Sequence, residues 1–156
     1  MTTSPAGVYS RELPALDRHI QIGLAQARVL SVEFPVEPDP EAVADPSYEL
    51  LDRVVAYFEG AREEFEGVTV ALTMRTDHRA ALEAIRKLPH GESATVEQIG
   101  RMAPELDSED ETSVVRAALA ANPVPLFVPD HRVTDGPSGA PTTVVRACRA
   151  LEGLSA

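Results

Sequence analysis

Several residue types are scarce in this chain, and each scarcity excludes a class of protein. The 156 residues include one cysteine, Cys148, and no tryptophan. A single cysteine excludes an internal disulfide and any metal cluster built from several cysteines. No apolar run approaches the roughly 20 residues that a membrane-spanning helix needs, and residues 1–13 lack the basic and apolar segments of a signal peptide. We therefore expect a cytoplasmic protein that does not associate with a membrane.

Positive charge is also scarce. The net charge is −11, and Lys87 is the only lysine among 14 basic residues. Residues 1–73 carry 5 basic and 13 acidic side chains, and residues 74–156 carry 9 and 12. Such an acidic, nearly lysine-free composition is typical of adaptation to a cytoplasm of high salt. Phosphate contacts depend on basic side chains, so a DNA-binding surface would need these few arginines on one face.

The sequence does contain a clear pattern of alternating apolar residues in its first half. Residues 7–12, 19–24 and 27–34 alternate apolar with polar side chains, which is the period of a β-strand. Apolar residues at helical spacing follow from Leu50 to Phe58, and Gly60 stands where a helix commonly ends. These patterns predict a small antiparallel sheet covered by one helix, in an N-terminal α/β domain of residues 1–73.

The second half, residues 74–156, reads as a separate helical domain. Asp77 is a candidate cap for a first helix, and Thr95 with Gln98 fits a capping box for a short second helix through Met102. The acidic run 107–111 precedes a third helix that reaches about Ala121, an arrangement that the helix dipole favours. The second and third helices have helix-turn-helix spacing in a winged-helix-like domain. A terminal helix follows over 144–154, in which we expect Cys148 to be a small core residue. The predicted fold class is α+β.

The segment Asn122–Val133, NPVPLFVPDHRV, is the most informative in the chain. It resembles the active-site signature of the alkylguanine-DNA alkyltransferases, in which Asn-Pro and a buried apolar strand lead into Pro-Cys-His-Arg-Val. That family transfers an alkyl group from a flipped guanine in DNA to the cysteine, once per protein molecule. Asp130 stands at the cysteine position here. No glycine-rich phosphate loop or zinc-binding spacing is visible, and we expect neither a cofactor nor a metal.

Other segments match the family in order and at nearly correct spacing. Tyr57–Gly60, Phe65 and a predicted apolar strand over 68–72 resemble the end of its N-terminal domain, which implies a remnant of a ribonuclease-H-like sheet and helix. Residues 81–85 and Leu88–Glu92 resemble the helix and turn that open its C-terminal domain. The resemblance therefore covers most of the chain.

The resemblance also implies the site residues. The family's catalytic positions fall on Asn122, Asp130, His131 and Glu152, with Glu152 at the glutamate of a Cys-His-Glu relay. Asn122 is also expected to hold its turn through side-chain hydrogen bonds. Six residues are the candidate DNA contacts: Thr95, Val96, Arg101, Ser113, Arg116 and Arg132.

Several of these positions depart from the family pattern. Thr95-Val96 replaces a Ser-Tyr pair whose tyrosine helps to rotate the target nucleotide. Ser113 replaces an arginine that fills the gap left by the flipped base, although Arg116 lies one helical turn later, on nearly the same face. The segment after His131 is shorter than in the family and lacks its Tyr-Ser-Gly-Gly loop.

The missing cysteine determines the expected chemistry. Alkyl transfer needs a soft nucleophile, and an aspartate is hard, well solvated and weakly nucleophilic. We therefore expect a degenerate alkyltransferase-like protein that transfers no alkyl group but retains binding to double-stranded DNA or to an alkylated guanine. Two alternatives are an alkyltransferase or alkyl-ester hydrolase that uses Asp130, and a protein-interaction module on the same fold, whose partner would be another protein.

Overall fold

The computed structural model describes residues 7–26, 28–37, 39–40, 49–65, 67–103, 106 and 111–154. The chain divides into two compact units, Met1–Ala71 and Leu72–Ala156. Among the described residues, no helix is long and apolar enough to cross a membrane.

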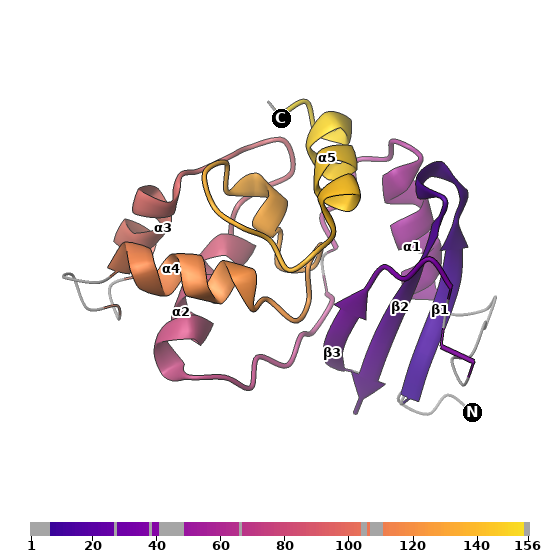
Figure 1. Cartoon of the computed structure of the whole chain (residues 1–156), viewed down its shortest axis with the longest axis horizontal. Coiled ribbons are helices and arrows are strands. Elements are labelled where there is room, and N and C mark those ends of the chain that lie inside the picture. The colour runs from indigo at the N-terminus through magenta and orange to yellow at the C-terminus, as the bar shows by residue number, and fades with distance from the viewer. Residues whose placement is uncertain are drawn as a thin grey trace. The chain divides into compact units, whose positions relative to one another are not determined.

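The first unit is built on a three-stranded antiparallel sheet (Figure 1). Strands β1 (Gly7–Leu13), β2 (Arg18–Ala25) and β3 (Arg28–Glu33) follow in that order across the sheet, with a 3-10 turn, η1 (Pro14–Leu16), between the first two. On β2 every second side chain, from Ile20 through Ile22 to Leu24, is buried. The predicted alternation is therefore the pattern of a sheet with one face in a core.

Helix α1 (Glu49–Phe58) supplies the apolar partner of this sheet. Its buried side chains are Leu51, Val54, Tyr57 and Phe58, and Asp52 on its opposite side accepts a hydrogen bond from Arg11 of β1 at 2.7 Å. The helix ends at Phe58, and Gly60 occupies the predicted position just beyond it. Its φ of 106° is a conformation that glycine adopts readily. Hydrogen bonds from Gly60 N to Tyr57 O and from Ala61 N to Ala56 O form the Schellman motif.

The strand predicted over 68–72 is wrong. Only one bridge forms there, in which Val29 N donates to Thr69 O and Ala71 N donates to Val29 O, each at 2.9 Å. The segment runs parallel to β3 for a single residue pair. Its apolar residues are typical of a strand, but within β3 only Val29 forms backbone hydrogen bonds with this segment.

The second unit is helical, which together with the sheet of the first unit confirms the α+β prediction. Its helices are α2 (Thr76–Arg86), α3 (Val96–Met102), α4 (Glu111–Ala120) and α5 (Thr142–Leu151), with a 3-10 turn, η2 (Asp130–Arg132). Helices α2, α3 and α4 pack against one another (Figure 1). The largest fully buried apolar side chains at their contacts are Leu82, Ile85, Ile99 and Leu119. Within the described part of this unit no extended strand forms, and an isolated bridge joins Ala94 to Val133.

Of the two caps predicted at helix N-termini, one is confirmed and one is wrong. The capping box is confirmed: Thr95 Oγ1 accepts from Gln98 N at 3.2 Å, and Gln98 Oε1 accepts from Thr95 N at 2.8 Å. The cap predicted at Asp77 is wrong. Helix α2 begins at Thr76, so Asp77 is already its second residue, and the N-cap residue Arg75 makes no side-chain cap hydrogen bond. Residues 107–110 of the acidic run lie outside the described residues, and α4 begins at Glu111.

The apolar segment before Asp130 is buried as predicted, but it forms turns in place of the strand that the resemblance implied. All residues from Val124 to Val128 are buried, and Val128 N donates back to Val124 O at 3.0 Å. Leu126 has a positive φ of 82°. Pro123, Pro125 and Pro129 lack the N–H that a strand ladder requires, so apolar character here favours burial without a strand.

Candidate functional site

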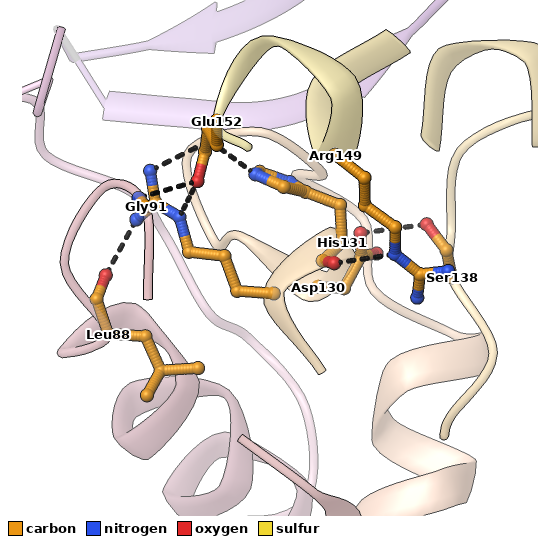
Figure 2. A network of polar contacts seen from close by, with 8 residues as sticks. Leu88, Gly91, Asp130, His131, Ser138, Arg149 and Glu152 are labelled. Atoms are coloured by element: carbon orange, nitrogen blue, oxygen red, sulfur yellow. Dashed lines mark hydrogen bonds and ion pairs between the residues drawn. The ribbon is translucent and has the colours of Figure 1, made fainter. Parts of the chain in front are cut away.

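Asp130 is the first residue of η2, and its carboxylate points into the second unit with 2% of the residue exposed. Three donors reach it. Asn122 Nδ2 and Gly139 N donate to Oδ2 at 3.0 and 2.8 Å, and Ser138 Oγ donates to Oδ1 at 2.7 Å. Figure 2 shows Asp130 and Ser138 turned toward one another. The residue at the family's acceptor position is thus held by neutral donors on both oxygens.

The segment that supplies two of these donors is packed closely on the rest of the unit. A Cβ atom at Gly139 would lie 2.2 Å from Asn122 O, and one at Gly136 would lie 2.5 Å from a methyl carbon of Leu119. Ser138 Oγ also accepts from Ala140 N at 2.9 Å. We call residues 135–141 the closing loop. Its backbone lies too near Asn122 and α4 for side chains at these two glycines.

Asn122 performs the structural role predicted for it. Its Oδ1 accepts from Val124 N at 3.0 Å, and its Nδ2 donates to Val128 O at 3.2 Å as well as to Asp130. The side chain therefore fixes both ends of the 124–128 turn and the carboxylate that follows it. A buried amide with all these bonds satisfied stabilises one backbone conformation.

Burial raises the pKa of Asp130 above its ordinary value. The bonds from Gly139, Ser138 and Asn122 and the nearby charge of His131 act against this rise, because each favours the ionised form. The desolvation of the carboxylate is the larger effect. A proton on this group can be accommodated, since Ser138 Oγ can accept a hydrogen bond as well as donate one.

Glu152 forms a second buried centre, at the C-cap of α5. Its side chain is 0% exposed and accepts four hydrogen bonds: from His131 Nε2 at 2.6 Å, Arg132 Nε at 2.7 Å, Arg132 Nη2 at 3.0 Å and Gly91 N at 3.0 Å (Figure 2). Arg132 Nη1 donates further to Leu88 O at 2.6 Å. A bidentate arginine–carboxylate pair of this kind compensates the charge of both partners.

The two centres use neighbouring residues but different partners. Asp130 is bonded to Asn122 and the closing loop, whereas the Nε2 atom of His131 is bonded to Glu152. The structure therefore brings the four predicted catalytic positions into one region. The histidine and glutamate of the expected relay are in hydrogen-bond contact. The position of the nucleophile holds the carboxylate of Asp130, whose oxygens already accept three hydrogen bonds.

Four of the six candidate DNA contacts are exposed or half-buried, and the other two are buried. Ser113 and Arg116 are exposed on α4, and Arg101 is exposed on α3, where it forms an ion pair with Glu97. Thr95 is half-buried and caps α3.

The expectation that Val96 and Arg132 contact DNA directly is not compatible with their burial. Val96 is 1% exposed and Arg132 is 6% exposed. Val96 lies in the core, and the guanidinium of Arg132 is occupied by Glu152 and Leu88. The apolar character of Val96 indicates a core residue. Nothing in the sequence around Arg132 distinguishes a buried arginine from an exposed one.

Sequence reasoning missed the residues that support the site from outside the signature. Ser138 and Gly139 lie in the shortened segment that departs from the family loop, yet they bind Asp130. Arg149 of α5 donates to His131 O at 2.9 Å (Figure 2). It also donates to Val133 O at 3.0 Å. An arginine in the last turn of a helix gives no sequence signal for such a contact.

Cys148 is buried in α5, as predicted. No group of three or more histidine, cysteine or acidic side chains among the described residues is arranged to hold a metal ion.

Comparisons with known proteins identify the family that the signature around Asp130 resembles. Residues 77–151 match the family profile described as the DNA-binding domain of 6-O-methylguanine DNA methyltransferase. A methylated-DNA–protein-cysteine methyltransferase from Methanopyrus kandleri is 33% identical over 114 residues, which are 71% of this chain and 83% of that relative.

Solved structures share the fold along nearly the whole chain. The Mycobacterium tuberculosis OGT in complex with DNA superposes with a TM-score of 0.73 at 21% identity, covering 95% of this chain and 93% of that one. The O6-methylguanine-DNA methyltransferase of Pyrococcus kodakaraensis strain KOD1 gives a TM-score of 0.64 at 15% identity, covering 95% and 99%.

Proposed function

The chain belongs to the methylated-DNA–protein-cysteine methyltransferase family, a family of DNA alkylation repair, and on this basis we propose that it is a DNA-binding member that transfers no alkyl group. The binding domain would be residues 74–156. In this proposal Asp130 has changed from an acceptor position into a structural carboxylate. His131 and Glu152 have lost their catalytic partner and serve to hold the C-terminal helix.

The bonding of Asp130 is the observation that carries the proposal. A nucleophile must reach the alkyl carbon with a lone pair, but this carboxylate is 2% exposed and accepts three hydrogen bonds. Hydrogen bonding and burial both lower its availability, in addition to the low intrinsic nucleophilicity of a carboxylate. A cysteine at this position would need His131 as a base. The Nε2 atom of His131 is bonded to Glu152, as in the expected relay, so the member of the relay that is missing is the thiol.

Support for DNA binding comes from the helix-turn-helix of α3 and α4. The family profile that matches residues 77–151 is that of a DNA-binding domain, and one relative of the same fold has been crystallised with DNA. Ser113 and Arg116 are exposed on the second of the two helices, which in this motif lies in the major groove. We propose alkylated-guanine duplex and undamaged duplex as the ligands to compare.

Intact-mass measurement tests the chemical part. After incubation with duplex carrying O6-methylguanine or O6-benzylguanine, we expect the protein mass to stay unchanged. A stable alkyl adduct on Asp130 or Cys148 would refute the proposal. Catalytic conversion of the alkylated guanine to guanine within the duplex, with the alkyl group released as methanol or benzyl alcohol, would support ester hydrolysis by Asp130. Titration of both duplexes at low and multimolar salt tests the binding part, and absence of binding at any salt would favour a protein-interaction role.

The variant Asp130→Cys separates loss of the nucleophile from loss of the whole site. The thiol is a poor acceptor for Asn122 Nδ2 and Gly139 N, so the free energy of unfolding should fall by about 1–3 kcal/mol. We expect little or no labelling by benzylguanine duplex, because Val96 and Ser113 offer nothing to rotate a nucleotide or fill its gap. Rapid labelling would show that the acceptor site is intact apart from the cysteine.

A further inference from the structure

One exposed residue of the closing loop, Asp135, contacts both helices of the helix-turn-helix. Its Oδ1 accepts from Val96 N, at the start of α3, at 2.7 Å. Its carbonyl oxygen accepts from Arg116 Nη1, on α4, at 2.9 Å. The capping box of α3 already satisfies Gln98 N through Thr95, so Asp135 satisfies a second amide at the same helix start. The loop is therefore attached to the start of α3 and to the middle of α4.

The same loop reaches Asp130 three residues later. Ser138 and Gly139 supply two of the three donors to the buried carboxylate. Between the two attachments, Gly136 lies against Leu119 and Gly139 lies against Asn122, each too closely for a side chain. Because this segment is short and closely packed, a displacement of Asp135 also displaces the backbone of Ser138 and Gly139, which donate to Asp130.

We propose that Asp135 is a positioning residue that couples Arg116 to the closing loop, so that a duplex which engages Arg116 loosens the loop over Asp130. This rests on the proposed function, in which α4 faces DNA. A phosphate forms stronger, charge-assisted hydrogen bonds with a guanidinium than a neutral carbonyl does. A phosphate near α4 therefore draws Arg116 away, and the exposed carbonyl of Asp135 then bonds to water. The coupling is reciprocal: a loop anchored on Asp130 holds Arg116 in one orientation before DNA arrives.

Hydrogen exchange of two backbone amides measures this coupling in the protein without DNA. Gly139 N reports the bond to Asp130, and Val96 N reports the bond to Asp135. We expect Arg116→Ala to accelerate exchange at both amides by roughly two- to tenfold, the effect of one surface hydrogen bond. Arg101→Ala is the matched control, because it removes the same charge from an exposed arginine bonded to Glu97 of its own helix. It should leave both amides unchanged.

The same measurement distinguishes a general loss of stability from coupling through the loop. A variant that is merely less stable would also accelerate the amides of α2, such as Leu82, whereas the proposed effect is confined to Gly139 and Val96. Arg116→Lys keeps a cationic donor at this position and should restore part of the protection. Equal exchange in Arg116→Ala and Arg101→Ala would overturn the proposal.

Addition of duplex tests the trigger. In the wild-type protein we expect bound duplex to accelerate exchange at Gly139, and in Arg116→Ala we expect bound duplex to add no further acceleration. Bound duplex with unchanged Gly139 exchange in the wild type would overturn the duplex as the trigger. If no duplex binds at any salt concentration, the proposed function fails, while the comparison of the two arginine variants without DNA still decides whether the loop and Arg116 are coupled.

Discussion

At the scale of single residues, the site contains two buried carboxylates that are satisfied in different ways. Glu152 is compensated by the guanidinium of Arg132 and is also hydrogen-bonded to His131. Asp130 accepts its three hydrogen bonds from an amide, a hydroxyl and a backbone N–H, none of which carries a full charge, and the influence of His131 does not outweigh its burial. An uncompensated buried charge costs more than one paired with an arginine, so the two residues should respond differently to loss of charge.

Asp130→Asn should be tolerated and should change the pH dependence of stability. The amide oxygen can take the two bonds now made to Oδ2, and the amide nitrogen can donate to Ser138 Oγ. Because the pKa of Asp130 is raised in the folded state above its ordinary 3.8, the folded protein holds a proton that the unfolded chain has released between these values. The contribution of Asp130 is thus largest below the unfolded-state pKa and falls as pH rises through the folded-state pKa.

Chemical denaturation of both proteins between pH 7 and about pH 3.5 measures this difference. The wild type should gain stability relative to Asp130→Asn as pH falls through the window from the raised pKa to 3.8. At neutral pH the variant should be at least as stable as the wild type, since it removes a buried charge. A stability difference that is constant with pH, or that changes in the opposite direction, would contradict the raised pKa.

Glu152→Gln should be much more damaging at neutral pH. The substitution is as nearly isosteric as Asp130→Asn, but it leaves the guanidinium of Arg132 buried without a counter-charge. Removing one partner of a buried ion pair costs about 3–5 kcal/mol. Urea denaturation of the two amide variants side by side provides the comparison, and similar losses in both would show that the Arg132 pair is not compensating Glu152.

At the scale of elements, the closing loop determines whether the acceptor region is open or filled. It has only seven residues, 135–141, and two of its glycines lie against Leu119 and Asn122. The prolines at 137 and 141 restrict its backbone further. This packing places Ser138 Oγ and Gly139 N next to Asp130, and the carboxylate accepts a hydrogen bond from each of them.

Gly139→Ala tests this packing. The added methyl group would meet Asn122 O, which is backbone and cannot rotate away. Moving the loop to relieve the clash would weaken the bond from Gly139 N to Asp130, so we expect a loss of about 1–3 kcal/mol. Thr142→Ala, at an exposed position just after the loop, is the control and should change the free energy of unfolding by less than about 0.5 kcal/mol. Equal stability of the two variants would show that the loop can adjust freely.

At the scale of the whole molecule, a net charge of −11 opposes binding to a polyanion. DNA binding, where it occurs, depends on the local arrangement of a few arginines and on the salt concentration. The acidic run that leads into α4 includes Glu109 and Asp110, and Glu111 is the first residue of the helix. Because α4 is the helix proposed to enter the groove, these charges should oppose phosphates more than acids elsewhere in the chain.

Changing Glu109, Asp110 and Glu111 together to glutamine should therefore tighten duplex binding, whereas Arg116→Ala should weaken it and lower the salt slope by about one unit. Fluorescence titrations against one labelled duplex at several salt concentrations measure both effects. A triple glutamine variant at the exposed Glu12, Glu37 and Glu59 of the first unit has the same net charge and controls for long-range attraction. If both triple variants bind equally, the effect is one of net charge, and α4 is not the contact.

The sequence by itself determined the elements that depend on local chemistry. Strand alternation predicted the three strands, Gly60 predicted the end of α1, and the Thr95–Gln98 capping box predicted the start of α3, because each signal lies within a few residues of its effect. The signature around Asn122 predicted the family and the burial of the segment before Asp130.

Only the tertiary structure decided what the predicted site residues do. Val96 and Arg132 are buried, and the strand predicted over 68–72 is reduced to one bridge. Ser138 and Gly139 face Asp130 because distant packing of the closing loop on Asn122 and α4 brings them there. A carboxylate at position 130 is read from the sequence, but one of its hydrogen-bond partners lies eight residues before it and the other two lie eight and nine residues after it. The distance between such groups is set by how the whole unit packs.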